Sequence, residues 1–224
     1  MEREPTQRII QGDCLEVMKG FADKSFDAII VDPPFGIGFA YGKEKDVANN
    51  KEDYGAFTKE WLSEARRVAK DGALFAVWQP ALYFKHFWEW FGDDIHIYAA
   101  CKNFVQLRKT PVNYAFDPVV IFYNGTPAIR PLKPKRNVDF FVSNTASLVS
   151  KPNRLERQHP CPRPLDVVKE IMANFSEGSI LDMFMGSGTT LVAAKQLNRN
   201  AVGIEISPEY CEIARRRLEQ DTLL

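Results

Sequence analysis

Residues 179–190 read SILDMFMGSGTT, and this stretch decides the fold. A short apolar strand is followed by a glycine turn and then by two threonines that can begin a helix. Gly186 and Gly188 allow the backbone to approach a ligand without a Cβ clash, and the N–H groups at the start of the helix would point at that ligand. The pattern differs from the dinucleotide-binding fingerprint because Leu191 stands where the third glycine would be. It also differs from a phosphate-binding loop because no Gly-Lys pair follows.

A second signal lies 17 residues beyond Gly188, where Glu205 stands near the end of the expected strand 201–206. An acidic side chain at the end of this strand can accept hydrogen bonds from both hydroxyls of a ribose. The two features together predict a nucleoside ligand that is bound without a phosphate cradle, and S-adenosylmethionine is such a ligand. An ordinary strand-to-helix turn without a ligand is the alternative.

Short apolar runs alternate along the chain with segments that have helical periodicity. This alternation predicts an α/β fold with a doubly wound, mostly parallel, seven-stranded sheet. The expected strands are 26–31, 73–78, 95–100, 119–123, 139–142, 179–183 and 201–206, and the expected helices are 53–70, 80–90, 165–175, 189–198 and 208–219. The segment from Asn124 to Pro164 breaks this rhythm, because it is rich in Pro, Asn, Ser and basic residues. We expect one domain over residues 1–224, with residues 124–158 as a short insertion.

The composition is that of an ordinary soluble domain, with 45% hydrophobic and 26% charged residues among 224. It excludes collagen-like, coiled-coil and disordered classes. The apolar runs are too short to cross a bilayer, and residues 1–5 lack the apolar stretch of a signal peptide. The four cysteines form no C-x-x-C pair, so no thiolate zinc site is indicated and a reducing compartment fits. We therefore expect a cytoplasmic protein with no membrane partner and no catalytic metal.

The net charge of zero conceals an uneven distribution. Residues 101–164 contain eleven Lys and Arg against three Asp and Glu, a balance of +8, and the rest of the chain carries −8. Such a basic region indicates a surface that faces a polyanion such as nucleic acid, with a solvated loop as the alternative.

The turn Asp32-Pro33-Pro34-Phe35 follows the expected strand 26–31. Two prolines in a row make the chain leave the strand in a stiff, extended path. Ligands of open α/β sheets bind at the carboxyl ends of strands, which is where this turn lies. The Asp32 carboxylate and the Pro33 carbonyl offer two acceptors and Phe35 offers a flat face, which together suit an exocyclic amine on a planar base. A strand-terminating turn with a solvated aspartate is the alternative.

With these motifs the chain resembles the DNA amino-methyltransferases, the enzymes that methylate the exocyclic amine of adenine or cytosine. It is similar to the group in which the Asp-Pro-Pro-aromatic turn precedes the Phe-x-Gly-x-Gly loop, the beta arrangement, and the resemblance covers essentially the whole chain. It implies the Rossmann-like methyltransferase fold, S-adenosylmethionine as cofactor and double-stranded DNA as partner. Asp32 resembles the adenine-N6 branch, because the cytosine-N4 branch usually carries serine there. The catalytic residues implied by the resemblance are Asp32, Pro33, Pro34 and Phe35.

Two further segments carry the resemblance. Gly12-Asp13-Cys14 looks like the family's acidic turn beside the cofactor adenine, and residues 159–164 look like its His-Pro-x-x-Lys-Pro segment beside the methionine part. This chain departs from the family pattern at two positions, since Arg163 replaces the usual lysine and Pro162 stands where glutamine is common. The implied cofactor-binding residues are Asp13, Cys14, Arg163, Asp182, Phe184, Gly186, Ser187, Gly188, Thr189, Thr190 and Glu205.

The insertion occupies the family's target-recognition position, and the positive charge lies in the same part of the chain. We expect its basic residues mainly to contact phosphates. They are Lys133, Lys135, Arg136, Lys151, Arg154 and Arg157. The aromatic-rich segment 83–91 has helical spacing that favours a core position, and it is also compatible with a homodimer interface.

Other functions stay open at this point. They are a cytosine-N4 DNA methyltransferase, an adenine methyltransferase acting on RNA, and a non-catalytic nucleic-acid-binding relic of the fold. A protein-glutamine methyltransferase is disfavoured, because in that family the cofactor loop comes before the Pro-Pro turn in the chain. A companion restriction nuclease would make the protein part of a restriction-modification system.

Overall fold

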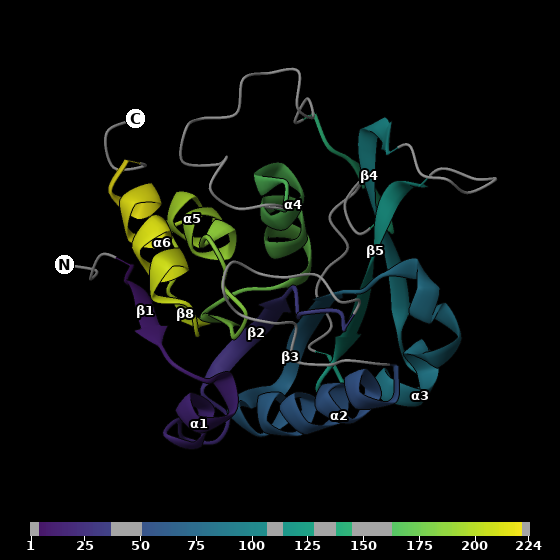
Figure 1. Ribbon diagram of the computed structural model, residues 1–224, viewed down its shortest axis with the longest axis horizontal. Helices are drawn as coiled ribbons and strands as arrows, with labels where there is room; N and C mark the ends of the chain where they lie inside the picture. The colour runs from purple at the N-terminus through teal and green to yellow at the C-terminus, as the bar shows by residue number, and fades with distance from the viewer. Residues whose placement is uncertain (1–4, 37–50, 107–113, 128–137, 145–162, 221–224) are drawn as a thin grey trace.

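Eight strands pair into one sheet within the part of the chain that the structure describes, which is residues 5–36, 51–106, 114–127, 138–144 and 163–220. The structure is a computed structural model, drawn in Figure 1. Its strands are β1 (Gln7–Gln11), β2 (Phe26–Val31), β3 (Ala69–Trp78), β4 (His96–Gln106), β5 (Tyr114–Tyr123), β6 (Phe140–Val142), β7 (Ile180–Asp182) and β8 (Ala201–Glu205). Across the sheet they run in the order β1-β8-β7-β2-β3-β5-β4-β6.

The sheet is mostly parallel, as predicted, since β5 runs antiparallel to its neighbours β3 and β4 while the other pairs are parallel. The predicted number of seven strands is wrong, because residues 7–11 form the additional edge strand β1. This segment reads QRIIQ and has only two apolar residues, which is enough for an edge strand that pairs on one side with β8. It lacks the apolar run that marks a strand buried between two neighbours.

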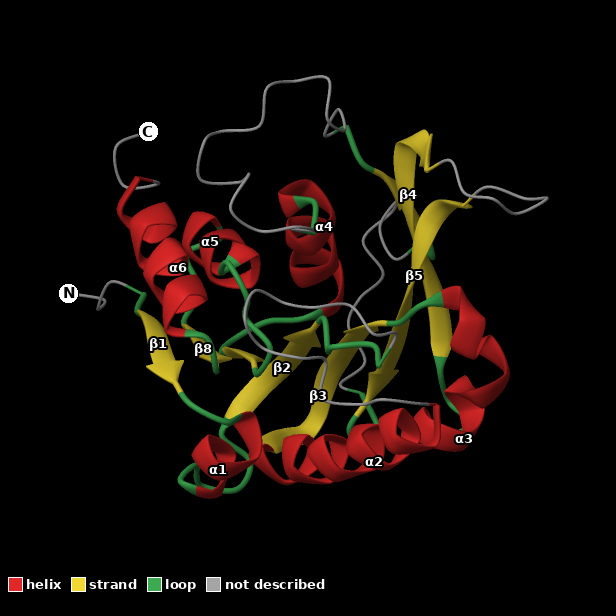
Figure 2. Cartoon of the chain, in the orientation of Figure 1, coloured by secondary structure: helices red, strands yellow, loops and turns green. Residues whose placement is uncertain are grey.

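Helices cover both faces of the sheet, so the molecule has three layers (Figure 2). The helices are α1 (Cys14–Lys19), α2 (Lys51–Val68), the 3-10 helix η1 (Ala81–His86), α3 (Phe87–Phe91), α4 (Leu165–Phe175), α5 (Thr189–Gln196) and α6 (Pro208–Gln220). Helices α1, α2 and α3 lie on one face, and α4, α5 and α6 lie on the other. No helix among the described residues combines the length and the apolar character that a membrane crossing requires.

Side chains of β2 and β3 alternate between the two cores. Ile29 and Phe75 pack with α1, α2 and α3, whereas Ile30 and Leu74 pack with α4, α5 and α6. Both strands are buried on both faces, which explains why they read as continuous apolar runs rather than as alternating ones. The carboxyl ends of the parallel strands β1, β8, β7 and β2 meet at one edge of the sheet, and this edge carries the predicted site.

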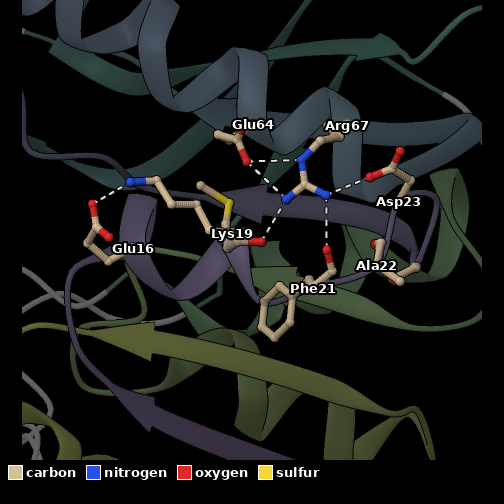
Figure 3. A network of polar contacts seen from close by, with 9 residues as sticks. Glu16, Lys19, Phe21, Ala22, Asp23, Glu64 and Arg67 are labelled. Carbon is tan, nitrogen blue, oxygen red and sulfur yellow. Dashed lines mark hydrogen bonds and ion pairs between the residues drawn. The ribbon is translucent and has the colours of Figure 1, made fainter.

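Arg67 near the end of α2 ties α1 and the turn after it to the body of the molecule (Figure 3). Its guanidinium donates to the backbone oxygens of Met18 at 2.7 Å and Phe21 at 2.9 Å. It also pairs with the carboxylates of Asp23 at 2.6 Å and Glu64 at 3.0 Å. One side chain therefore adds a charged donor to the carbonyl of Met18, which also accepts from the backbone N–H of Phe21, and to the carbonyl of Phe21 in the turn after α1.

We expect Arg67→Met to lower the free energy of unfolding by roughly 1–3 kcal/mol, because the two carbonyls lose a charged donor while the aliphatic bulk is kept. Urea denaturation measures this loss. Arg216→Met is the matched control, since Arg216 contacts Glu212 on an exposed face of α6 and should change stability by less than about 0.5 kcal/mol. Equal losses in the two variants would contradict this role of Arg67.

Candidate active site at the carboxyl edge of the sheet

The glycine loop follows β7 and begins α5. Gly186 and Gly188 adopt φ values of 53° and 82°, the left-handed region that glycine favours. A Cβ atom on Gly188 would lie 2.8 Å from the Cβ of Ala214 in α6, so a side chain at this position is excluded by packing as well as by backbone strain. Thr189 and Thr190 are buried at the start of α5.

Glu205, the last residue of β8, holds this loop in place through hydrogen bonds. Its carboxylate accepts from the backbone N–H of Gly186 at 2.8 Å and from that of Ser207 at 2.9 Å. These two bonds fix the orientation of the Glu205 carboxylate, and its predicted contact with a ribose stays a prediction. The predicted acidic side chain thus lies directly beside the predicted glycine loop.

Asp182 at the end of β7 is buried, with 4% of its surface exposed. It accepts from the backbone N–H of Phe184 at 3.1 Å and from the hydroxyl of Thr190. Burial raises the pKa of Asp182 to about 7, and the nearby carboxylates of Asp32 and Glu205 push the pKa in the same direction. Three carboxylates gathered at this edge favour a positively charged ligand.

The turn after β2 places Asp32 at the same edge, since β2 and β7 are neighbours in the sheet. Behind the turn, the hydroxyl of Tyr83 donates to the backbone oxygen of Phe35 at 2.9 Å, and the Tyr83 ring stacks on Tyr54 at 4.8 Å between centroids. The ring of Phe35 is partly buried against both cores. The Pro-Pro turn is therefore held from behind by aromatic side chains of α2 and η1.

Arg163, which precedes α4, binds Asp32 through two parallel hydrogen bonds. Its Nε and Nη2 donate to the two carboxylate oxygens of Asp32 at 2.7 and 2.6 Å. Its Nη1 donates to Asp117 in β5 at 3.1 Å, and its guanidinium carbon lies 5.6 Å from the centre of the Phe35 ring. The predicted cation thus lies at this edge of the sheet and contacts the candidate catalytic carboxylate. Its predicted contact with a cofactor stays a prediction.

The sequence matches a family model described as DNA methylase, of the N6/N4 type, over residues 26–216. The chain belongs to this family. The type II methyltransferase M.HpaI of Haemophilus parainfluenzae is 28% identical over 242 residues, which cover 96% of this chain and 75% of the relative.

Two solved structures confirm the Rossmann-like fold of this DNA methylase. The M1.HpyAVI–SAM complex superposes with a TM-score of 0.70 at 20% identity, over 95% of this chain and 99% of that chain. The PvuII DNA methyltransferase, which is cytosine-N4-specific, superposes with a TM-score of 0.75 at 16% identity, over 99% of this chain and 93% of that chain.

Asp13 and Cys14 also lie near the site. The N–H of Gly12 donates to the backbone oxygen of Glu205 at 3.0 Å, which brings this turn beside the end of β8. Asp13 caps α1, and its Oδ1 accepts from the N–H groups of Leu15 at 2.9 Å and Glu16 at 3.2 Å. Cys14 is buried, and burial raises the pKa of its thiol to about 12. Their predicted contacts with the cofactor stay predictions.

Sequence patterns do not mark three residues at this edge, which are Arg217, Asp117 and Lys102. Arg217 of α6 donates from Nη1 to the backbone oxygen of Ser187 at 2.8 Å and to the Thr189 hydroxyl at 3.1 Å, so it braces the glycine loop. Asp117 contacts Arg163 and also accepts from Lys102 of β4 at 2.7 Å. No motif marks these three positions, because each acts through a side-chain pairing between distant segments.

The predicted DNA-contacting residues lie outside the described part of the chain. They are Lys133, Lys135, Arg136, Lys151, Arg154 and Arg157. Among the described residues, no group of three or more His, Cys, Asp and Glu side chains is placed to hold a metal ion.

Proposed function

We propose that this DNA methylase transfers a methyl group from S-adenosylmethionine to the exocyclic N6 amine of adenine in double-stranded DNA. The observation that carries the proposal is the position of the Asp-Pro-Pro-Phe turn beside the glycine loop, at the ends of the neighbouring strands β2 and β7. Asp at position 32 supports adenine as the target base.

The acidic character of the site suits S-adenosylmethionine, which carries a sulfonium and an ammonium group. Burial raises the pKa of Asp182, and the carboxylates of Asp32 and Glu205 add to this shift, so a cationic ligand would stabilise the ionised form of Asp182. Glu205 would hold the ribose hydroxyls, residues 182–188 would surround the amino-acid part, and Asp13 would accept from the adenine amine. When bound, the cofactor supplies a methyl group that its sulfonium activates for transfer.

The acceptors of the turn prepare the target amine. The amine is a poor nucleophile because its lone pair is delocalised into the ring. The Asp32 carboxylate and the Pro33 carbonyl would each accept one hydrogen, which favours a pyramidal nitrogen with a free lone pair. Positive charge develops on this nitrogen during transfer, and the negative charge of Asp32 stabilises it. Asp32 then takes the proton, so no covalent intermediate is needed.

The target base must leave the DNA helix to reach this edge of the sheet. Phe35 would stack on the extruded base, which recovers about 1–3 kcal/mol. Positioning of the two reactants supplies much of the remaining rate enhancement.

The pKa of Asp182 predicts a pH-dependent cofactor affinity. A cationic ligand favours ionised Asp182, so binding below a pH of about 7 must expel a proton and becomes weaker. We expect the Kd for S-adenosylmethionine to rise as the pH falls from about 8 to about 6. Asp182→Asn has no such carboxyl group and should show a flatter profile by titration calorimetry. Identical profiles for the two proteins would exclude Asp182 as the titrating group.

The basic insertion gives a second prediction, which concerns DNA. If all six of Lys133, Lys135, Arg136, Lys151, Arg154 and Arg157 contact phosphates, the binding constant should fall with salt at a log–log slope of about −5. Charge reversal at Lys135 and Arg136 should weaken binding to every DNA sequence alike and leave cofactor affinity unchanged. A DNA affinity that does not depend on salt would show that the duplex binds elsewhere.

Cytosine N4 is the second candidate target, because the PvuII enzyme, which has the same fold, is cytosine-N4-specific. Both target amines need the same two acceptors, so the described geometry alone accommodates either. Incubation with methyl-labelled S-adenosylmethionine and unmethylated duplex DNA, followed by nucleoside analysis, separates the two. We expect N6-methyladenine, and N4-methylcytosine instead would overturn the adenine assignment. A parallel incubation with RNA tests the nucleic acid, and label in RNA with none in the duplex DNA would overturn the DNA assignment.

A further inference from the structure

The guanidinium of Arg163 is hydrogen-bonded to Asp32, the carboxylate that the proposed reaction needs. Both oxygens of Asp32 accept hydrogen bonds from it, in the parallel geometry that makes Arg–carboxylate pairs strong. The side chains are 19% exposed for Arg163 and 30% exposed for Asp32, so the pair is partly shielded from water and from salt.

This pair opposes methyl transfer in two ways. The target amine must approach the same carboxylate, where the guanidinium already holds one lone pair on each oxygen. In addition, the amine nitrogen becomes positive during transfer, and a neighbouring guanidinium repels that charge and neutralises the carboxylate that should stabilise it. Asp32 is therefore a better acceptor when Arg163 has moved away from it.

Asp117 offers the guanidinium a second anionic partner at the same place. It lies in β5 opposite Ala100 of β4, just before the part of β5 that also pairs with β3, so its backbone belongs to the sheet. It already accepts from Nη1 of Arg163 at 3.1 Å. Its other oxygen accepts from Lys102 at 2.7 Å, so the four side chains form an alternating chain of charges from Lys102 to Asp32.

We propose that Asp117 is a positioning residue for the methyl transfer. It retains Arg163 when the target amine displaces the guanidinium from Asp32, and so it leaves Asp32 as a free carboxylate facing the amine. This inference rests on the proposed function, because it concerns the same carboxylate. A purely structural ion pair between Asp117 and Arg163 would have no such effect on the reaction.

The test is a set of single-turnover methylation rates, measured with saturating labelled S-adenosylmethionine and excess enzyme on duplex DNA from a host without DNA methylation. Asp117→Asn removes the charge with little change in shape, and we expect it to slow transfer about tenfold while the Kd for the cofactor stays unchanged. In an Arg163→Met background the guanidinium is absent, so Asp117→Asn should change the rate by no more than about twofold. Asp117→Glu restores the charge and should recover part of the lost rate.

Asp27→Asn is the matched control. Asp27 is a partly buried aspartate of β2 that pairs with Lys70 at 2.8 Å and accepts from Ser179, at the opposite edge of the sheet. It should alter stability and leave the transfer rate unchanged. A wild-type rate in Asp117→Asn, or a tenfold loss that persists in the Arg163→Met background, would overturn the inference while the proposed function stands. An absence of any methylated base with the wild-type protein would overturn both.

Discussion

Asp32→Ala should lower the methyl-transfer rate by about three orders of magnitude, since this change removes both an acceptor for the target amine and the charge that stabilises its transition state. The cofactor should still bind, with a Kd within about threefold of the wild-type value, because the glycine loop and Glu205 are untouched. We expect Arg163 to keep its contact with Asp117 in this variant.

Single-turnover rates and calorimetric titration with the cofactor measure the two parts of this prediction. Asp27→Ala serves as control, because it removes a carboxylate from the same strand at the far edge of the sheet. Full activity in Asp32→Ala would show that the Asp-Pro-Pro-Phe turn is not the catalytic turn. A parallel loss of cofactor binding would show that Asp32 belongs to the cofactor site instead.

Glu205→Ala should weaken S-adenosylmethionine binding by about 1–3 kcal/mol, the value of charge-assisted hydrogen bonds to the ribose. The structure adds a second reason, because the Glu205 carboxylate also holds the backbone N–H groups of Gly186 and Ser207. Without it the glycine loop keeps the bond from the Met185 N–H to the backbone oxygen of Ile204 but loses the bond from Gly186 to β8.

Calorimetric Kd values for the wild-type protein, Glu205→Ala and Glu205→Gln test this assignment. Glu205→Gln keeps a single acceptor oxygen and should lie between the other two. Glu212→Ala is the control on α6, since Glu212 pairs with Arg215 and Arg216 in exposed positions. An unchanged Kd in Glu205→Ala would place the ribose at a different strand end.

The central strands could be predicted because they are buried on both faces. Residues 26–31 read FDAIIV, and they form β2 with the predicted bounds.

Helix α2 ends at Val68 rather than at residue 70, since β3 begins at Ala69. The pair Asp71-Gly72 has the composition of a stop signal after a helix, whereas Gly72 lies within β3 at a φ of 74° and donates to the backbone oxygen of Asn124 at 2.7 Å. A glycine turn next to a helix looks the same in sequence as a glycine kink at the start of the following strand.

The positions of Asp32, the glycine loop and Glu205 could be predicted as a group, because parallel strands bring their carboxyl ends to one edge. The pairing of Arg163 with Asp32 could not, since the two residues lie 131 positions apart and no sequence period links them. The same holds for Arg217 and Ser187, which meet only because α6 packs against the glycine loop. Side-chain pairings of this kind depend on the packed tertiary structure, which local sequence patterns do not encode.

Expression of the chain in a bacterial host that lacks DNA methylation tests the central claim most directly. Genomic DNA from these cells is digested to nucleosides, and the methylated bases are measured by mass spectrometry. The proposed function predicts N6-methyladenine in cells that express the wild-type chain and none in cells that express Asp32→Ala at an equal level. DNA without N6-methyladenine despite folded, cofactor-binding protein, or equal N6-methyladenine with both chains, would contradict it.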